Sequence, residues 1–365
     1  MPKNFSVLVL ELHPYHTHNF SIYSNLLPSL VCRNTVNIEY YVNPEVVDGL
    51  IYPEKQHLHR LLPSVFWDRM LSKFRLRTAY IILLVKLLCI LKRIDCVVLN
   101  TLESTTDKRV FRSINTKLKI AVVHNPKVID VKREKNALYF CMNEYVFQGM
   151  NNSAPLDGYF LSYFKPMEFK KTVMSETLTI GVPGGVSFDR RDYHFLIQVC
   201  LKLAECEKPE REIIFNLIGD IGMKDGPEFR RLTEKNGINK YFRFHEELDD
   251  SQFNREIYEC ELLMPLIGDA NTRYRSIKNT ATLSHSARYH KPLLLQLEDA
   301  KCWGIPQHSC FIYSGLNDLT ELLSQSKVVD REIKDTYQAH IEKKIEKNKN
   351  LLSRLGERFF TPGKF

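Results

Sequence analysis

The chain has 365 residues, of which 44% are hydrophobic and 26% are charged. This balance excludes a disordered polypeptide and predicts a globular protein large enough for two domains. The formal net charge of +8 favours an anionic ligand or an anionic membrane surface. Nine cysteines, none in a C-x-x-C pair, argue against a disulfide scaffold and for a reducing compartment.

The start of the chain carries no pattern of a secretory signal. A strand-like apolar run begins at Phe5, and no basic segment, apolar core and small-residue cleavage site precede it. We therefore expect a cytoplasmic protein.

The first half of the chain alternates strand-like and helix-like segments. Strands are predicted at 5–12, 36–42, 95–100, 118–124 and 158–163, and helices at 20–31 and 103–114, while 137–147 suits either. This rhythm predicts a parallel sheet with right-handed crossovers, in which ligands bind beyond the carboxyl ends of the strands.

Histidines and a glutamate follow three of these predicted strand ends. His16 and His18 lie in the loop after the first strand, Glu103 follows the strand at 95–100, and His124 ends the strand at 118–124. Three histidines within 13–18 raise the alternative of a metal site, but the loop lacks an evident second shell, and we expect a polar loop.

A basic stretch interrupts the first half. Residues 55–94 hold nine lysines and arginines against one acid, Asp68, around the apolar run 79–91. That run is too short to span a bilayer and contains Lys86, so we interpret it as a core helix. For 58–77 two interpretations stay open, an anionic membrane surface or a solvated face.

The second half repeats the alternation. Strands are predicted at 178–182, 213–219, 241–245, 261–266 and 292–296, helices at 193–204, 226–236 and 249–259, and a terminal helix at 330–358. A glycine loop at 181–194 stands where the first of these strands passes to a helix. By itself this loop is either a phosphate cradle, with Gly184, Gly185, Arg190 and Arg191, or an ordinary turn with solvated arginines.

The order of motifs in this half resembles the C-terminal domain of GT-B glycosyltransferases of the family 4, or group 1, type. The resemblance extends over about 178–296 and includes the glycine loop with Arg190 and Arg191, the strand ending at Gly219, and 278–282 before a Lys-Pro strand. It implies an α/β protein of GT-B fold, with two Rossmann-like domains facing each other across a cleft. We expect an acceptor domain at 1–170 with a basic, apolar insertion near 55–94, a donor domain at 171–330, and a helix at 331–365 that packs back on the first domain.

The resemblance also implies site residues. A nucleotide-diphosphate sugar would bind through Gly184, Gly185, Arg190, Arg191 and Gly219, and through a second segment with Lys278, Asn279, Thr280, Thr282 and His285. On the acceptor side His124, His18, His16 and Glu103 are the candidates for a catalytic role. The loop at 181–194 is then interpreted as one wall of a diphosphate site.

One departure from the family pattern concerns two glutamates. Many members carry them eight positions apart, the later one seven residues before the proline, and these positions hold Ile277 and His285 here. The ribose and sugar contacts must therefore differ, and both retention and inversion stay open. No Asp-x-Asp pair occurs in the chain, so we expect no metal and no cofactor besides the nucleotide-sugar co-substrate.

The function expected from this resemblance is hexosyl transfer to a glycan or a lipid-linked glycan. The protein would be cytoplasmic, or peripheral on the inner face of the membrane, and would take part in polysaccharide or glycolipid biosynthesis. A nucleotide-sugar epimerase of the same fold and a non-catalytic nucleotide- or glycan-binding protein are the alternatives. No nucleic-acid partner is expected, because the basic stretch lacks a recognisable module.

Overall fold

The computed structural model describes residues 5–13, 20–32, 35–43, 58–61, 74–124, 136–150, 156–163, 169, 177–206, 211–325 and 331–360. The chain forms two compact units, one of residues 1–162 with 344–365 and one of residues 163–343. The predicted site residues His16 and His18, and most of the stretch 58–77, lie outside the described residues.

The first unit contains a seven-stranded parallel sheet in the order β3-β2-β1-β4-β5-β6-β7. Its elements are β1 (Phe5–Glu11), α1 (Phe20–Leu30), β2 (Val36–Val42), β3 (Leu58–Arg60), α3 (Phe74–Leu91), β4 (Cys96–Leu102), α4 (Thr105–Ser113), β5 (Leu118–Val123), β6 (Ala137–Met142), α5 (Glu144–Met150) and β7 (Gly158–Phe160). The segment 137–147, which the sequence left open between strand and helix, forms the strand β6 and the start of the helix α5.

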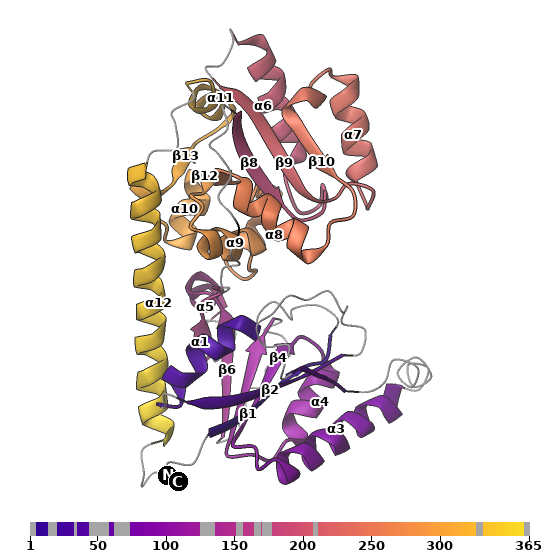
Figure 1. Cartoon of the computed structure of the whole chain (residues 1–365), viewed down its shortest axis with the longest axis vertical. Helices are drawn as coiled ribbons and strands as arrows, with labels where there is room; N and C mark the ends of the chain where they lie inside the picture. The colour runs from indigo at the N-terminus through magenta and orange to yellow at the C-terminus, as the bar shows by residue number, and fades with distance from the viewer. Residues whose placement is uncertain are drawn as a thin grey trace. The chain divides into compact units, whose positions relative to one another are not determined.

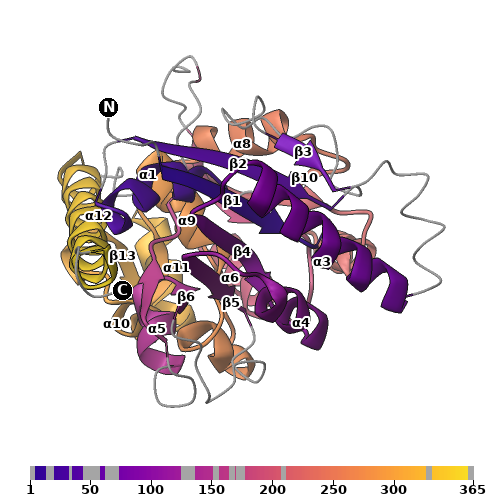
Figure 2. The same cartoon turned by 90° about the horizontal axis from the view of Figure 1, so that it is seen from below.

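The strand order places helices on both faces of this sheet. From β1 the chain first moves outward to β3, then returns through α3 to β4 and continues outward to β7. Right-handed crossovers on the two sides of β1 require opposite faces for α1 and for α3 with α4, and Figure 2 shows α3 beside α4. Strands β4, β5 and β6 are buried at every residue, as expected for a parallel sheet covered on both faces.

The second unit contains a four-stranded parallel sheet in the order β10-β9-β8-β11 and a parallel pair, β12 and β13. Figure 1 labels β8, β9, β10 and the pair. Its elements are β8 (Thr177–Pro183), α6 (Tyr193–Glu205), β9 (Glu212–Asp220), α7 (Gly226–Lys235), η4 (Asn239–Tyr241), β10 (Phe242–His245), α8 (Asp250–Glu259), β11 (Leu262–Leu263), η5 (Asp269–Arg275), α9 (Ala281–Tyr289), β12 (Leu294–Gln296), α10 (Leu297–Trp303), η6 (Gln307–Ser309), β13 (Phe311–Tyr313) and α11 (Leu316–Ser324).

Local sequence explains how the helices of this unit begin. Asp192 caps α6 by accepting the Phe195 N–H at 2.9 Å. Asp249 caps α8 in a capping box with Gln252. Because parallel strands share one carboxyl edge, the loops after β8, β9 and β10 gather there.

The last helix, α12 (Arg331–Phe360), contributes to both units. Near its start, the Tyr337 hydroxyl lies 2.6 Å from the Ser286 hydroxyl of α9, within the second unit. Further along, buried Asn348 accepts the Leu161 N–H at 3.0 Å and donates to the Tyr159 carbonyl at 2.8 Å, next to β7. The later turns of α12 are thus held by backbone atoms of the first unit.

The interpretation of 79–91 as a core helix is wrong for much of its surface. Within α3 only Thr78, Ile81 and Val85 are buried among the residues whose side chains are described. Leucines and isoleucines on the opposite side are exposed, because the run is apolar all round and a single face meets the sheet. None of the described helices has the length and hydropathy that crossing a membrane requires.

Candidate functional site

Two glycine-containing strand ends meet at the carboxyl edge of the second unit's sheet. Gly184 has a φ of +102°, which favours glycine, and its N–H donates to the Ile218 carbonyl at 2.7 Å. A Cβ on Gly219 would lie 2.6 Å from the Gly184 carbonyl carbon, whereas a Cβ on Gly185 would meet no atom within 4 Å. The predicted residues Gly184, Gly185 and Gly219 therefore lie together, with open space beside Gly185.

The two arginines follow directly and occupy different positions. The Arg191 guanidinium folds back over the loop and donates to the Gly184 carbonyl at 3.2 Å. Arg190 is exposed. Both backbone N–H groups donate to the Ser187 carbonyl at 3.0 Å. The resulting turn sets both side chains just before the N-terminus of α6, where the helix dipole adds positive potential.

A third cation, Lys224, joins this loop from the next strand connection. Its ammonium lies 2.7 Å from the Ser187 hydroxyl and 3.0 Å from an Asp189 carboxylate oxygen. The Phe188 N–H donates to the Asp225 carboxylate at 2.8 Å, so the β9–α7 connection and the glycine loop are tied together. Sequence reasoning missed Lys224, and the one available signal was its place after a neighbouring strand end.

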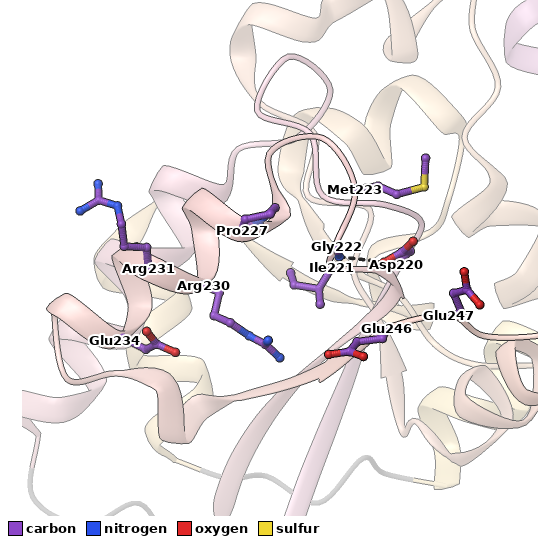
Figure 3. A pocket seen from close by; sticks show the side chains of 10 residues that line it. All are labelled: Asp220, Ile221, Gly222, Met223, Pro227, Arg230, Arg231, Glu234, Glu246 and Glu247. Atoms are coloured by element: carbon purple, nitrogen blue, oxygen red, sulfur yellow. Dashed lines mark hydrogen bonds between the residues drawn. The ribbon is translucent and has the colours of Figure 1, made fainter.

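A pocket of about 730 Å³ opens on the other side of the β9–α7 connection. Figure 3 shows Arg230 and Glu246 reaching toward the same space, while Arg231 extends away from it and is paired with Glu228 at 2.7 Å. The pocket is lined by Asp220, Ile221, Gly222, Met223, Pro227, Arg230, Arg231, Glu234, Glu246 and Glu247. It thus offers carboxylates, a guanidinium and exposed apolar surface at the β9–α7 connection, which itself contacts the glycine loop.

The second predicted segment follows η5 and leads into α9. The Lys278 ammonium lies 5.7 Å from the centre of the Tyr274 ring, and Asn279 is half-buried. His285 is half-buried and packs edge-on against Phe253, with ring centres 5.4 Å apart. The connection between β11 and η5 is linked to the glycine loop, because the Asp192 N–H donates to the Leu266 carbonyl at 3.1 Å.

The two predicted threonines of this segment are inside the protein. Thr280 is the N-cap residue of α9 and is buried, and its side chain makes no capping hydrogen bond. Thr282 is completely buried, and its hydroxyl has no hydrogen-bond partner among the described residues. A ligand would reach either hydroxyl only after a local shift of the α9 N-terminus.

In the first unit, polar groups gather at the carboxyl ends of β1, β4 and β5. His124 follows β5, and its N–H donates to the Leu102 carbonyl at 3.1 Å, which places it beside the end of β4. The Glu103 N–H donates to an Asp107 carboxylate oxygen at 3.1 Å. The predicted residues His124 and Glu103 are therefore at the same edge of the sheet.

Sequence reasoning missed a buried carboxyl group at this edge, that of Glu11. Its side chain accepts hydrogen bonds from Asn100, from the Thr101 hydroxyl at 2.7 Å and from the His13 N–H at 2.8 Å, and Tyr23 in turn donates to Asn100. Burial raises the pKa of Glu11 to about 7, against the lowering effect of these donors. Only its place at the end of an apolar strand distinguished this glutamate.

His13 and Asp107 form a second polar pair at this edge. The His13 ring nitrogen Nε2 lies 3.3 Å from an Asp107 carboxylate oxygen, and this hydrogen bond raises the pKa of His13. Burial alone would raise the pKa of Asp107, but the hydrogen bonds from His13, Ser104 and Glu103 together lower it. His13 is thus held by a carboxylate, the arrangement that orients a histidine for proton transfer.

Comparisons with solved structures identify the fold. A glycosyltransferase from Rickettsia africae ESF-5 matches over 99% of this chain and 100% of its own, with a TM-score of 0.64 and 12% identity. Sucrose-phosphate synthase from Thermosynechococcus elongatus matches over 98% of this chain and 99% of its own, with a TM-score of 0.58 and 11% identity. The lipopolysaccharide outer core galactosyltransferase WaaB matches over 95% and 99%, with a TM-score of 0.55 and 12% identity.

These likenesses, together with two parallel α/β units, show that the chain has the GT-B fold of glycosyltransferases, built from two Rossmann-like domains. The predicted fold class is confirmed. No family model and no curated protein matches the sequence. The fold is therefore identified from the structure, and the activity has to be inferred from the residues of the site.

Proposed function

We propose that the protein is a glycosyltransferase that moves a sugar from a nucleotide-diphosphate donor to a glycan or lipid-linked glycan, with the donor bound by the second unit. The observation that carries this proposal is the junction of the two glycine strand ends. Gly184 and Gly219 abut through backbone atoms, Arg191 folds over Gly184, and the space beside Gly185 is open. Backbone amides, a guanidinium and a helix N-terminus together suit a diphosphate.

The cations around this junction suit the leaving group of glycosyl transfer. As the glycosidic bond to the donor breaks, negative charge grows on the departing nucleoside diphosphate. Arg191 and the α6 N-terminus stabilise that charge, and Arg190 and Lys224 add to the local potential. This is chemistry that a divalent cation performs in enzymes with an Asp-x-Asp pair, a motif that this chain lacks.

The nucleoside of the donor then extends into the adjoining pocket. Its floor is the β9–α7 connection, whose other side carries Lys224 and contacts the glycine loop. The carboxylates of Glu246 and Glu247 accept hydrogen bonds from ribose hydroxyls. They take the part of the glutamates that the family carries at the positions of Ile277 and His285.

The acceptor side is assigned to the carboxyl edge of the first unit's sheet. His13 is held by Asp107 at 3.3 Å, and His124 stands at the neighbouring strand end. Either imidazole is suited to remove the proton of an acceptor hydroxyl. Alanine in place of the histidine that removes this proton should lower turnover and leave donor affinity unchanged.

A panel of nucleotide sugars, offered with glycan and lipid-linked acceptors, tests the activity. We expect steady release of a nucleoside diphosphate with at least one donor. If the protein binds nucleotide but releases no nucleoside diphosphate with any donor and acceptor, it is a non-catalytic binding protein. The replacement of both family glutamates favours that alternative.

The variant Arg191→Ala tests the diphosphate site. Loss of one charge-assisted hydrogen bond of about 1.5–3 kcal/mol corresponds to a roughly 10- to 100-fold rise in the donor Kd. The matched control is Lys240→Ala, which removes an exposed charge from η4 at the opposite edge of the same sheet. Equal donor affinity in Arg191→Ala and Lys240→Ala would refute the site, and melting temperatures verify that both variants fold.

A further inference from the structure

The outer face of α3 carries an apolar stripe of four residues. Leu83, Leu87, Ile90 and Leu91 are 58%, 46%, 73% and 76% exposed, respectively. Their spacing of four, seven and eight positions places them on one side of the helix, over a length of about 12 Å. We call these four residues the α3 stripe. A contiguous exposed apolar surface of this kind marks an interaction site.

The α3 stripe is separate from the residues that hold α3 in the fold. Ile81 and Val85 are buried, and helical spacing places them on the side opposite to Leu83 and Leu87. Figure 2 shows α3 at the side of the first unit, flanked by α4. The stripe therefore adds nothing to the core of this unit, and its four exposed apolar side chains are free to contact a partner.

Positive charge borders the α3 stripe. Lys86 lies on α3 between Leu83 and Leu87 in the sequence and is exposed, and exposed Arg93 follows the helix end. Lys92 does not contribute, because its ammonium is paired with the Glu39 carboxylate at 2.6 Å. The sequence holds no acidic residue between Arg69 and Ile94, so no carboxylate of this segment offsets these cations.

We propose that the α3 stripe docks on an anionic lipid bilayer, with Leu83, Leu87, Ile90 and Leu91 in the acyl boundary and Lys86 and Arg93 at the phosphate headgroups. An interfacial helix buries its apolar side about 5–10 Å deep and gains from anionic lipid through lysine and arginine. The helix lies on the membrane and does not cross it, since its other side packs on the sheet.

Charge favours a membrane over a second copy of the chain as the occupant. Two copies joined through the α3 stripe would bring Lys86 and Arg93 of each toward those of the other, and like charges repel across an interface. An anionic bilayer matches both the apolar and the cationic parts. This proposal stands independently of the proposed glycosyl transfer.

Vesicle sedimentation of the full chain tests the proposal. The probes are vesicles of phosphatidylcholine alone and of phosphatidylcholine with phosphatidylglycerol at about two to one. We expect the wild type to sediment with the anionic vesicles and to be released by high salt. Wild type that stays in the supernatant with anionic vesicles overturns the proposal.

Two double variants separate the apolar and the electrostatic contributions. Leu87→Ser with Ile90→Ser, and Lys86→Glu with Arg93→Glu, should each weaken partition to anionic vesicles about tenfold or more. The controls are Met223→Ser, an apolar residue 64% exposed in the second unit, and Lys240→Glu. Because all substituted side chains are exposed, melting temperatures should be unchanged. Partition equal to wild type in both double variants overturns the proposal.

Sedimentation velocity without lipid tests the alternative occupant of the α3 stripe, a second copy of the chain. We expect a monomer whose sedimentation coefficient is the same for wild type and for Leu87→Ser with Ile90→Ser. A dimer that this double variant dissociates would assign the α3 stripe to self-association and overturn the membrane assignment.

Discussion

Glu11 illustrates how a single buried group links the fold to pH. Its carboxyl group is fully buried at the end of β1, among Asn100, Thr101 and the His13 N–H. Through the bond to His13 it holds the start of the following loop. The ionisation state of Glu11 therefore influences the polar edge to which the acceptor side is assigned.

The pKa of Glu11 predicts a loss of stability as the pH rises. Burial raises this pKa from 4.5 to about 7, so between these values the folded chain holds a proton that the unfolded chain has released. Stability is therefore greatest at low pH in this window and falls as the pH rises through 7, by at most ~3 kcal/mol. His13, whose pKa is also raised, contributes in the same direction.

Glu11→Gln should remove most of this pH dependence, because the amide carries no charge. The measurement is urea unfolding from pH 5 to 8, read from the exchange protection of the β1 amides, with Glu205→Gln, an exposed carboxyl of the second unit, as control. An identical pH slope in Glu11→Gln and wild type would contradict the assignment.

Two glycines give different predictions for stability and the same prediction for donor binding. A Cβ at Gly219 meets backbone atoms of Gly184 and Gly185 at 2.6–2.7 Å, so Gly219→Ala must displace the loop, at about 1–3 kcal/mol. Gly185→Ala meets no atom and should leave the melting temperature near wild type. Both should weaken donor binding, Gly185→Ala because its methyl group fills the space proposed for phosphate.

Thermal melting and nucleotide titration of the two variants provide the measurement. Gly185→Ala binding nucleotide as tightly as wild type would show that no phosphate approaches the loop there.

At the scale of elements, the sequence predicts those whose signals are local. The strand at 36–42 has the predicted bounds. A helix was predicted at 249–259, and α8 spans Asp250–Glu259. The glycine loop was also predictable, because glycines and arginines between a strand and a helix are a short-range pattern. What such patterns lack is information about neighbours distant in the chain.

The missed features depend on those distant neighbours. Lys224 reaches Ser187 across 37 positions, and Glu11 meets Asn100 across 89. The outward side of α3 was hidden for a different reason. Apolar residues occur on every side of this helix, so the periodicity of the sequence does not indicate which side is buried. Only the packing on the sheet shows which side is exposed.

At the scale of the whole molecule, α12 is the helix that has contacts in both units. Gly356 lets this helix approach the first unit, since a Cβ there would lie 1.9 Å from the Leu30 carbonyl oxygen. Each unit carries its polar loops at the carboxyl edge of its sheet, the place where parallel α/β proteins bind ligands.

In the proposed function, the second unit binds the nucleotide part of the donor at the glycine loop. Hydrogen–deuterium exchange of the full chain, with and without nucleoside diphosphates, tests it most directly. We predict slower exchange at 183–192 and 219–225, with no change at 5–11. Protection confined to the first unit, or no protection at the glycine loop while a nucleotide is bound, would contradict the account.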